Sequence, residues 1–188
     1  LKDYASPKSK LTTMIKSGEV IRLRRGLFLA GGNTSYSIKT LANKIYGPSY
    51  ISFEYALSYY NLIPERVETV TSATNAKNKN KRFDTPVGSF LYRNIPRTVY
   101  PYGIIRKEEG DNPFLIATKE KALCDTLSKI RGISSIKTLT SLLFENLRLD
   151  KEELFTVNME DMVFLAPLYR KKILDLFLEY LKTEESGA

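Results

Sequence analysis

The sequence predicts an α+β protein with three successive parts: a basic helix with a basic hairpin, an antiparallel β-meander with packed helices, and a helical C-terminal part. Two observations predict this order. Apolar residues recur at helical spacing at both ends of the chain, and short strand-like runs punctuated by Pro and Gly fill residues 67–116. With 43% hydrophobic and 27% charged residues in 188, the composition is ordinary for a globular protein.

The first predicted helix begins after Ser6 and ends before Gly18. The Ser6 side chain is suited to accept a backbone N–H bond as the N-cap, and Gly18 supplies a stop. Leu11, Met14 and Ile15 recur at three- and four-residue spacing on one face. We expect this face to pack and the opposite, polar face to remain free for a partner.

A hairpin is predicted directly after this helix. Apolar residues alternate with arginines from residue 20 to residue 25, and Gly26 permits a tight reversal before Leu27. A helix followed by a basic two-stranded ribbon is the shape of the second half of a winged helix-turn-helix. Only the last turn of the supporting helix fits into residues 1–5, so we expect a winged helix whose N-terminal helices are missing.

The exposed side of the helix and ribbon is predicted to bind double-stranded DNA. Helix residues would contact the major groove or its flanking phosphates, and the ribbon arginines would approach the backbone or the minor groove. The predicted DNA-binding residues are Lys8, Ser9, Lys10, Thr12, Thr13, Lys16, Arg22, Arg24 and Arg25. A solvated cationic helix followed by an unrelated hairpin explains the pattern about equally well.

The charge and the residue types absent from the chain limit the classes of function. A net charge of +8 favours polyanionic partners such as nucleic acid or an anionic membrane surface. No apolar run approaches the roughly 20 residues that span a bilayer, so we expect a cytoplasmic protein without a membrane partner. The chain has no histidine and one cysteine, Cys124, which excludes His-dependent catalysis and standard zinc sites. We expect no cofactor and no metal.

Two helices are predicted between the hairpin and the strands. Ser35 or Ser37 caps the first, which ends at Gly47-Pro48. Ser52 is a plausible N-cap of the second, and Asn61 followed by Pro64 ends it. Both helices are expected to pack against the strands that follow.

The strand-like runs predict an antiparallel meander. They read VETVTSAT, RFDTPVGSFLYRNI, VYPYGIIRKE and NPFLIAT. The polar run between the first two, residues 75–81, is predicted to be a hairpin tip. Its lysines and Arg82 could contact a phosphate backbone, although a solvated loop is the simpler interpretation.

The remainder of the chain is predicted to be helical. Thr118 caps a helix that contains Cys124, expected to be a small buried residue. Pro167 is predicted to begin the last amphipathic helix. The run Lys119-Glu120-Lys121 is only close to the short Glu-x-Lys pattern of some nucleases, because Glu120 and Lys121 are adjacent. Its charges fall in the first turns of a helix, where a structural role is favoured. Adjacent carboxylates elsewhere diverge too much to share a metal or a proton. We therefore expect no enzymatic activity.

Several runs in order resemble the AbiEi-type antitoxins of bacterial type IV toxin-antitoxin systems. The resemblance rests on KSGEVIRLRRGLFLA, YISFEYALSYYNLIPERVETVTSAT, RFDTPVGSFLYRNI, YGII and FLIATKEKALCDTL, and it extends to about Ile130. The helical C-terminal part is less diagnostic. Asn61 stands where a glycine is expected, and Asn tolerates the left-handed backbone that a glycine would adopt there.

The resemblance implies two domains and two activities. Residues 1–32 would be the winged helix-turn-helix domain, with its recognition helix at residues 8–16 and its wing at residues 21–29, and residues 33–188 would be the antitoxin domain. Members of the family repress their own operon by binding promoter DNA and counteract a nucleotidyltransferase-like toxin without a stable complex. The alternative is a nucleic-acid-processing enzyme or an RNA-binding module that uses the meander; a purely structural interaction domain is a third.

Overall fold

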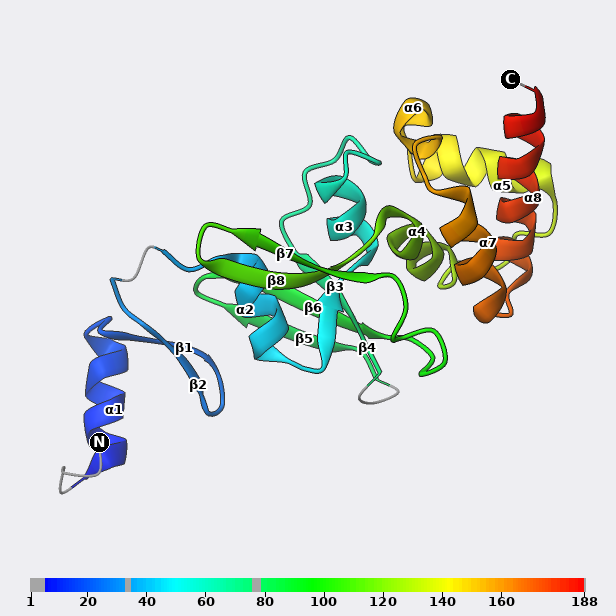
Figure 1. The fold of residues 1–188 in the computed structure, drawn as a ribbon. Coiled ribbons are helices and arrows are strands. Elements are labelled where there is room, and N and C mark those ends of the chain that lie inside the picture. The colour runs from blue at the N-terminus through cyan, green and yellow to red at the C-terminus, as the bar shows by residue number, and fades with distance from the viewer. Residues whose placement is uncertain (1–5, 33–34, 76–78, 188) are drawn as a thin grey trace.

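The computed structural model describes residues 6–32, 35–75 and 79–187. The molecule is elongated: a helix and a hairpin lie at one end, a β-sheet lies in the middle, and a group of helices lies at the other end (Figure 1). The chain passes through these parts in order, so the two termini lie at opposite ends. The prediction of a mixed α+β protein is confirmed.

The basic helix and hairpin form where the sequence places them. Helix α1 (Pro7–Lys16) is followed by strands β1 (Val20–Arg24) and β2 (Leu27–Ala30), which pair antiparallel. Gly26 has a φ of +78°, which the tight turn between the strands requires. The assignment of these elements to a winged helix stays a prediction, as does the domain boundary at residue 32.

The predicted capping role of Ser6 is wrong. Its side chain makes no capping hydrogen bond, although its carbonyl accepts the first helical bond from the Lys10 N–H group at 3.1 Å. This end of the helix is exposed, so water can satisfy the free N–H groups, and Pro7 removes one of them.

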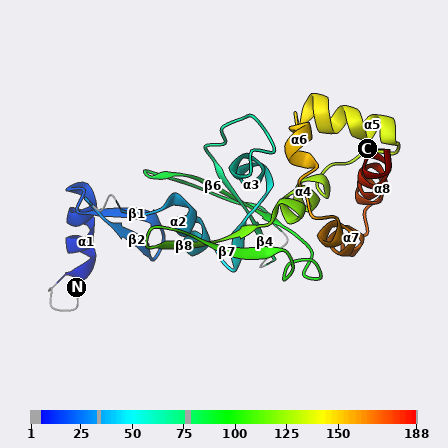
Figure 2. The same ribbon diagram turned by 45° about the horizontal axis from the view of Figure 1, so that its top comes forward.

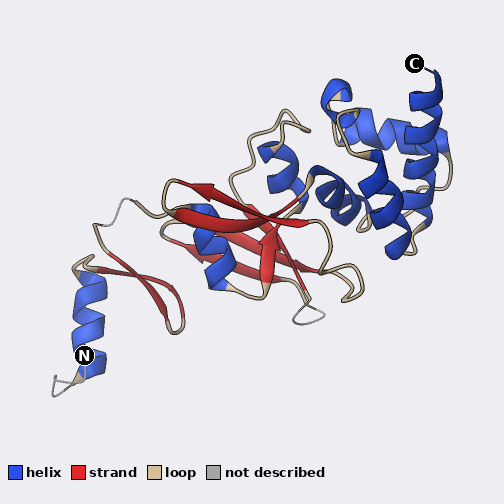
Figure 3. Cartoon of the chain, in the orientation of Figure 1, coloured by secondary structure: helices blue, strands red, loops and turns tan. Residues whose placement is uncertain are grey.

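The central sheet, whose strands are red in Figure 3, has six strands. Their order is β5-β6-β4-β3-β8-β7. The strands are β3 (Ser49–Ile51), β4 (Val70–Thr74), β5 (Lys81–Thr85), β6 (Gly88–Asn94), β7 (Ile104–Glu109) and β8 (Asn112–Ala117). The β5–β6 and β7–β8 hairpins and the β3–β4 pair are antiparallel, but β4 pairs parallel with β6 and β3 pairs parallel with β8. The predicted antiparallel meander is therefore wrong: the sheet is mixed.

The prediction of an antiparallel meander is wrong in two places. Strand β6 inserts between β4 and β5, so the polar run of residues 75–81 connects strands that are not neighbours and is not a hairpin tip. Residues 76–78 of that run lie outside the described residues. Strand β3 is only three residues long and was not anticipated, yet it joins the two halves of the sheet.

Helices cover both faces of the sheet. The Tyr92 hydroxyl of β6 donates to the carbonyl of Ala42 in α2 (Ile38–Ile45), at 2.6 Å. On the opposite face, Arg93 donates to Glu54 of α3 (Phe53–Tyr59) at 2.6 Å. Because successive residues of a strand point to opposite faces, α2 and α3 lie on different sides of the sheet. Helix α4 (Lys119–Leu127) packs beside α3.

The C-terminal helices gather beyond α4, away from the hairpin (Figure 2). They are α5 (Ile136–Ser141), the π-helical turn η1 (Leu142–Asn146), α6 (Lys151–Leu154), α7 (Met159–Leu168) and α8 (Lys172–Gly187). Pro167 lies in the last turn of α7 and does not begin the last helix, so that prediction is wrong. The break falls at Arg170, whose φ of +52° ends the helical path.

One hydrophobic core runs from the sheet into the C-terminal helices. It includes the fully buried Ile51, Phe90 and Phe177, and also Cys124, whose predicted burial is confirmed. Asn61 has a φ of +58°, which confirms the left-handed backbone expected there. In the part of the chain that the structure describes, no helix is long and apolar enough to cross a membrane.

Candidate functional site

Helix α1 displays most of the predicted recognition residues to solvent. Lys8, Ser9, Thr12, Thr13 and Lys16 are exposed, and Lys10 is half-buried. None of the α1 residues is buried. The hydroxyls of Thr12 and Thr13 donate to the carbonyls of Lys8 and Ser9, at 2.9 and 3.2 Å. These two hydroxyls therefore have their protons engaged within the helix, whereas the side chains of Lys8 and Lys16 are exposed at its surface.

The hairpin has an anchored face and an exposed basic face. Leu23 is 5% exposed and belongs to the core, and β1 contacts the edge strand β5. Arg22 and Arg24 lie on either side of Leu23 along β1, and both are exposed. A β-bulge between them interrupts the regular alternation of side chains. Arg25 is exposed in the turn, where its carbonyl accepts a bond from the Arg24 guanidinium at 3.0 Å. The three arginines thus gather at the free end of the hairpin.

A second cluster, which the sequence did not reveal as a unit, surrounds Asp125 of α4. Its carboxylate is fully buried and accepts hydrogen bonds from three hydroxyls. Tyr50 and Ser52 donate to Oδ2 at 2.9 and 2.7 Å, and Tyr169 donates to Oδ1 at 2.6 Å. Ser52 is the N-cap residue of α3, as predicted, but because of this arrangement its side chain makes no capping hydrogen bond. The carboxylate links β3 to the end of α7.

Lys121 completes this cluster one helical turn away. Its side chain is fully buried, and its ammonium donates to the Val99 carbonyl and to the Tyr169 hydroxyl oxygen, both at 2.7 Å. The ammonium also lies 3.6 Å from Oδ1 of Asp125. We call Lys121, Asp125, Tyr50, Ser52 and Tyr169 the buried polar cluster. Each of its charged groups has hydrogen-bond partners, as burial of charge requires.

Burial and charge set the ionisation of the cluster in ways that suit its hydrogen bonds. Burial, reinforced by the Asp125 charge, raises the pKa of Tyr50 and Tyr169 well above the ordinary value, so both phenols keep the protons they donate. Burial lowers the pKa of Lys121, and the nearby Asp125 carboxylate opposes that shift.

The side chains of the Lys119-Glu120-Lys121 run make contacts with neighbouring elements. Lys119 donates to Glu153 of α6 at 2.6 Å, and Glu120 accepts the backbone N–H of Asn158, the N-cap of α7, at 2.8 Å. Lys121 belongs to the buried polar cluster. All three side chains therefore join α4 to its neighbours, as the structural interpretation of this run expects.

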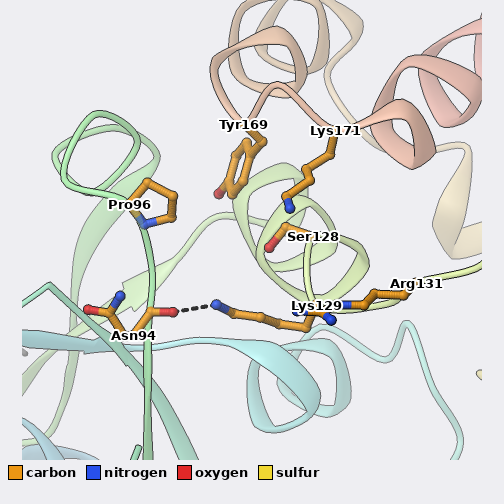
Figure 4. A pocket seen from close by; sticks show the side chains of 7 residues that line it. All are labelled: Asn94, Pro96, Ser128, Lys129, Arg131, Tyr169 and Lys171. Atoms are coloured by element: carbon orange, nitrogen blue, oxygen red, sulfur yellow. Dashed lines mark hydrogen bonds between the residues drawn. The ribbon is translucent and has the colours of Figure 1, made fainter. Parts of the chain in front are cut away.

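A basic pocket adjoins the buried polar cluster. It encloses about 270 Å³ and includes in its lining Asn94, Ser128, Lys129, Arg131, Tyr169 and Lys171 (Figure 4). These residues come from the end of β6, the segment after α4 and the link between α7 and α8. No sequence pattern predicted this pocket; its only signals were the short basic runs SKIR and YRKK, which lie far apart in the chain.

Comparisons with known proteins do not extend this description. A scan against protein-family models finds no match, and a search of curated proteins finds no relative. Within residues 6–32, 35–75 and 79–187, no group of three or more Cys, His, Asp or Glu residues is arranged to hold a metal ion. The protein therefore has two candidate sites. The first is the basic helix α1 together with the hairpin, and the second is the basic pocket.

Proposed function

We propose that the protein is a DNA-binding autorepressor and an antitoxin of a type IV toxin-antitoxin system. Its targets would be the operator DNA of its own operon and, functionally, a nucleotidyltransferase-like toxin that it counteracts without a stable complex. The antitoxin part of this proposal rests on the sequence resemblance. The DNA-binding part rests on the residues of α1 and the hairpin.

The observation that carries the DNA-binding proposal is the exposure of cations at the free end of the molecule. Residues 6–32 contain six cationic side chains and a single acidic one, Glu19, whose carboxylate accepts a bond from the Ser17 hydroxyl at 2.6 Å. Clustered and exposed lysines and arginines attract the phosphate backbone and release its counterions. Leu23 holds the hairpin against the sheet edge, which would fix the arginines relative to the bound duplex.

The test is DNA binding by a variant in which Arg22, Arg24 and Arg25 are changed together to Ala. Its affinity for the upstream DNA of its operon should fall, and the slope of log K against log salt should flatten by about 0.9 for each phosphate that the variant no longer neutralises. The matched control changes Lys137, Lys172 and Lys182 to Ala, which removes the same charge from the helical end of the molecule. Equal affinity of the arginine variant and the unaltered protein would refute the wing assignment.

The same arginine variant separates the two proposed activities. Because the antitoxin activity is assigned to residues 33–188, the variant should still rescue cells arrested by the toxin while it fails to repress the operon. The measurements are growth after toxin induction and expression of a reporter from the operon promoter. Loss of rescue by a folded variant would contradict the assignment of the two activities to different parts of the chain.

A further inference from the structure

The basic pocket carries more positive charge than its surroundings neutralise. Among the described residues, no carboxylate forms an ion pair with Lys129, Arg131 or Lys171. The nearby Asp125 is already matched by Lys121 within the buried polar cluster. The C-terminal end of α4 faces this region, but a helix end supplies only about half a negative charge. Three cations therefore converge on a hollow with little to balance them.

The cationic side chains that line the pocket retain donors that can bind a ligand. The Lys129 ammonium donates to the Asn94 carbonyl, and an ammonium has further protons to offer (Figure 4). No hydrogen bond or ion pair occupies the side-chain donors of Arg131 or Lys171 within the described residues. The hydroxyls of Ser128 and Tyr169 donate instead to the carbonyl and the carboxylate of Asp125, at 2.7 and 2.6 Å. A ligand would thus meet cationic donors and hydroxyl oxygens that have already donated their protons.

The lowered pKa of Lys129 is consistent with an excess of positive charge around the pocket. Burial lowers its pKa, and the neighbouring cations Arg93 and Lys171 lower it further, against the opposing effect of Asp125. Cations that repel one another across a hollow are stabilised when an anion enters between them.

The size and shape of the pocket limit the kind of anion. A volume of about 270 Å³ accommodates one or two phosphate groups but lies below the roughly 300–1,000 Å³ of sites that enclose a whole drug-sized ligand. The phosphates of a duplex lie along a continuous convex backbone, which suits an exposed basic surface such as α1 and the hairpin. A hollow lined by a guanidinium and two ammonium groups suits a phosphate group at the end of a molecule.

We propose that the pocket formed by Lys129, Arg131 and Lys171 binds a terminal phosphate group, as carried by a free nucleotide or by the 5′ end of a nucleic acid strand. Arg131 would hold two phosphate oxygens with its planar guanidinium, and the two lysines would neutralise the remaining charge. The Asn94 side-chain amide could add a neutral hydrogen bond. This proposal does not depend on the DNA-binding role of the hairpin.

The test is calorimetric titration of the full chain with pyrophosphate, a nucleoside triphosphate, and two oligonucleotides that differ only in a 5′-phosphate or a 5′-hydroxyl. The unaltered protein should bind pyrophosphate saturably, and Lys171→Gln should weaken that binding at least tenfold. Lys172→Gln removes the same charge one residue away and should leave the affinity unchanged, since Lys172 does not line the pocket. Competition between the nucleotide and the 5′-phosphorylated strand then identifies the source of the phosphate.

Three results would overturn the proposal. The first is absence of saturable binding by every ligand that carries a terminal phosphate. The second is equal weakening by Lys171→Gln and Lys172→Gln, which would indicate a diffuse charge effect. The third is equal binding of the 5′-hydroxyl and 5′-phosphate strands by the triple arginine variant, in which the hairpin no longer contributes, because this would assign the contact to internal phosphates. The Lys171 side chain is exposed, so its variant is expected to fold, and a thermal melt checks this. The triple arginine variant of the hairpin should bind pyrophosphate as the unaltered protein does.

Discussion

The Lys121 ammonium lies 3.6 Å from Asp125 Oδ1, one turn along α4, and neither side chain has any exposed surface. This pair stands where three parts of the molecule meet. Asp125 accepts hydroxyl bonds from Tyr50 of β3 and from Tyr169 after α7, while Lys121 reaches the Val99 carbonyl in the loop after β6. The pair therefore fixes the C-terminal helices to the sheet, and with them the basic pocket that Tyr169 lines.

Removing one member of this pair should be costly. Asp125→Asn leaves the Lys121 charge buried without its partner, and we expect a loss of about 3–5 kcal/mol in the free energy of unfolding. Urea denaturation followed by circular dichroism measures it. Asp111→Asn makes the same chemical change at an exposed turn and should stay within about 0.5 kcal/mol. Similar values for the two variants would show that the buried charges are not coupled to folding.

Two of the serines predicted as N-caps, Ser37 and Ser52, should respond differently to aspartate. Ser37 caps α2 by accepting the Lys39 N–H at 3.2 Å, so Ser37→Asp, which preserves a capping oxygen, should be tolerated. Ser52 instead donates to Asp125 at 2.7 Å, so Ser52→Asp places a second carboxylate against the first and should cost at least about 3 kcal/mol. Thermal or urea unfolding of both variants compares them. If Ser52→Asp proved as stable as Ser37→Asp, the bond to Asp125 would not govern this position.

Gly103 allows the loop before β7 to approach α4. A Cβ at Gly103 would lie 2.8 Å from the Lys121 Cβ, whereas a Cβ at Gly110 would meet nothing within 4 Å. Both glycines have positive φ values, +64° and +57°, so alanine strains the backbone at each. Gly103→Ala should therefore destabilise the protein by about 1–3 kcal/mol more than Gly110→Ala, because only the former also pushes Lys121 aside. Paired urea titrations test this, and equal losses would contradict the close approach.

Alkaline pH should destabilise the protein through its buried phenols. Burial raises the pKa of Tyr50, Tyr92 and Tyr169 above the ordinary value. Unfolding exposes these phenols to water, where they ionise above about pH 10, so the folded state then holds more protons than the unfolded state. The free energy of unfolding should fall by about 1.4 kcal/mol per pH unit for each such phenol.

Lys121, the lysine of the buried polar cluster, contributes a pH dependence of stability that has the opposite sign and covers a lower pH range. Because its folded pKa is lowered, Lys121 makes stability rise with pH only until unfolded lysine deprotonates, at about pH 10.4. Above that value the buried phenols and the buried Cys124 thiol, whose pKa burial also raises, make the free energy of unfolding fall with pH. Urea unfolding at a series of pH values measures this fall, and Tyr92→Phe should reduce it by the contribution of one phenol. Full appearance of tyrosinate absorbance while the protein remains folded would contradict the burial of these phenols.

Local sequence signals predicted local structure well. The Arg25-Gly26 turn, the caps at Ser37 and Thr118 and the left-handed Asn61 all follow from short-range backbone chemistry, and the structure has each of them. The basic residues of α1 and the hairpin were also found, because they are close together in the sequence. Prediction failed at Ser6, whose side chain makes no capping bond and whose ψ of 84° departs from the extended backbone of residues that do cap helices here, such as Ser135.

Strand order and the basic pocket could not be predicted in this way. The parallel pairing of β4 with β6 depends on which strand fills the space beside β4, and no residue pattern within either strand specifies its neighbour. The pocket joins Asn94 to Lys171, which are separated by most of the C-terminal half of the chain. Neither residue is distinctive alone.

The sequence by itself determined the basic N-terminal helix and hairpin, the positions of most helices and strands, and an excess of positive charge, because these depend on neighbouring residues and on composition. Only the tertiary structure decided what Lys121, Asp125 and Ser52 do. Periodicity marks them as residues of a helix start, a helix face and a cap. Burial made a hydrogen-bonded partner necessary for each, and those partners lie on β3, on α4, on the loop after β6 and on the link after α7.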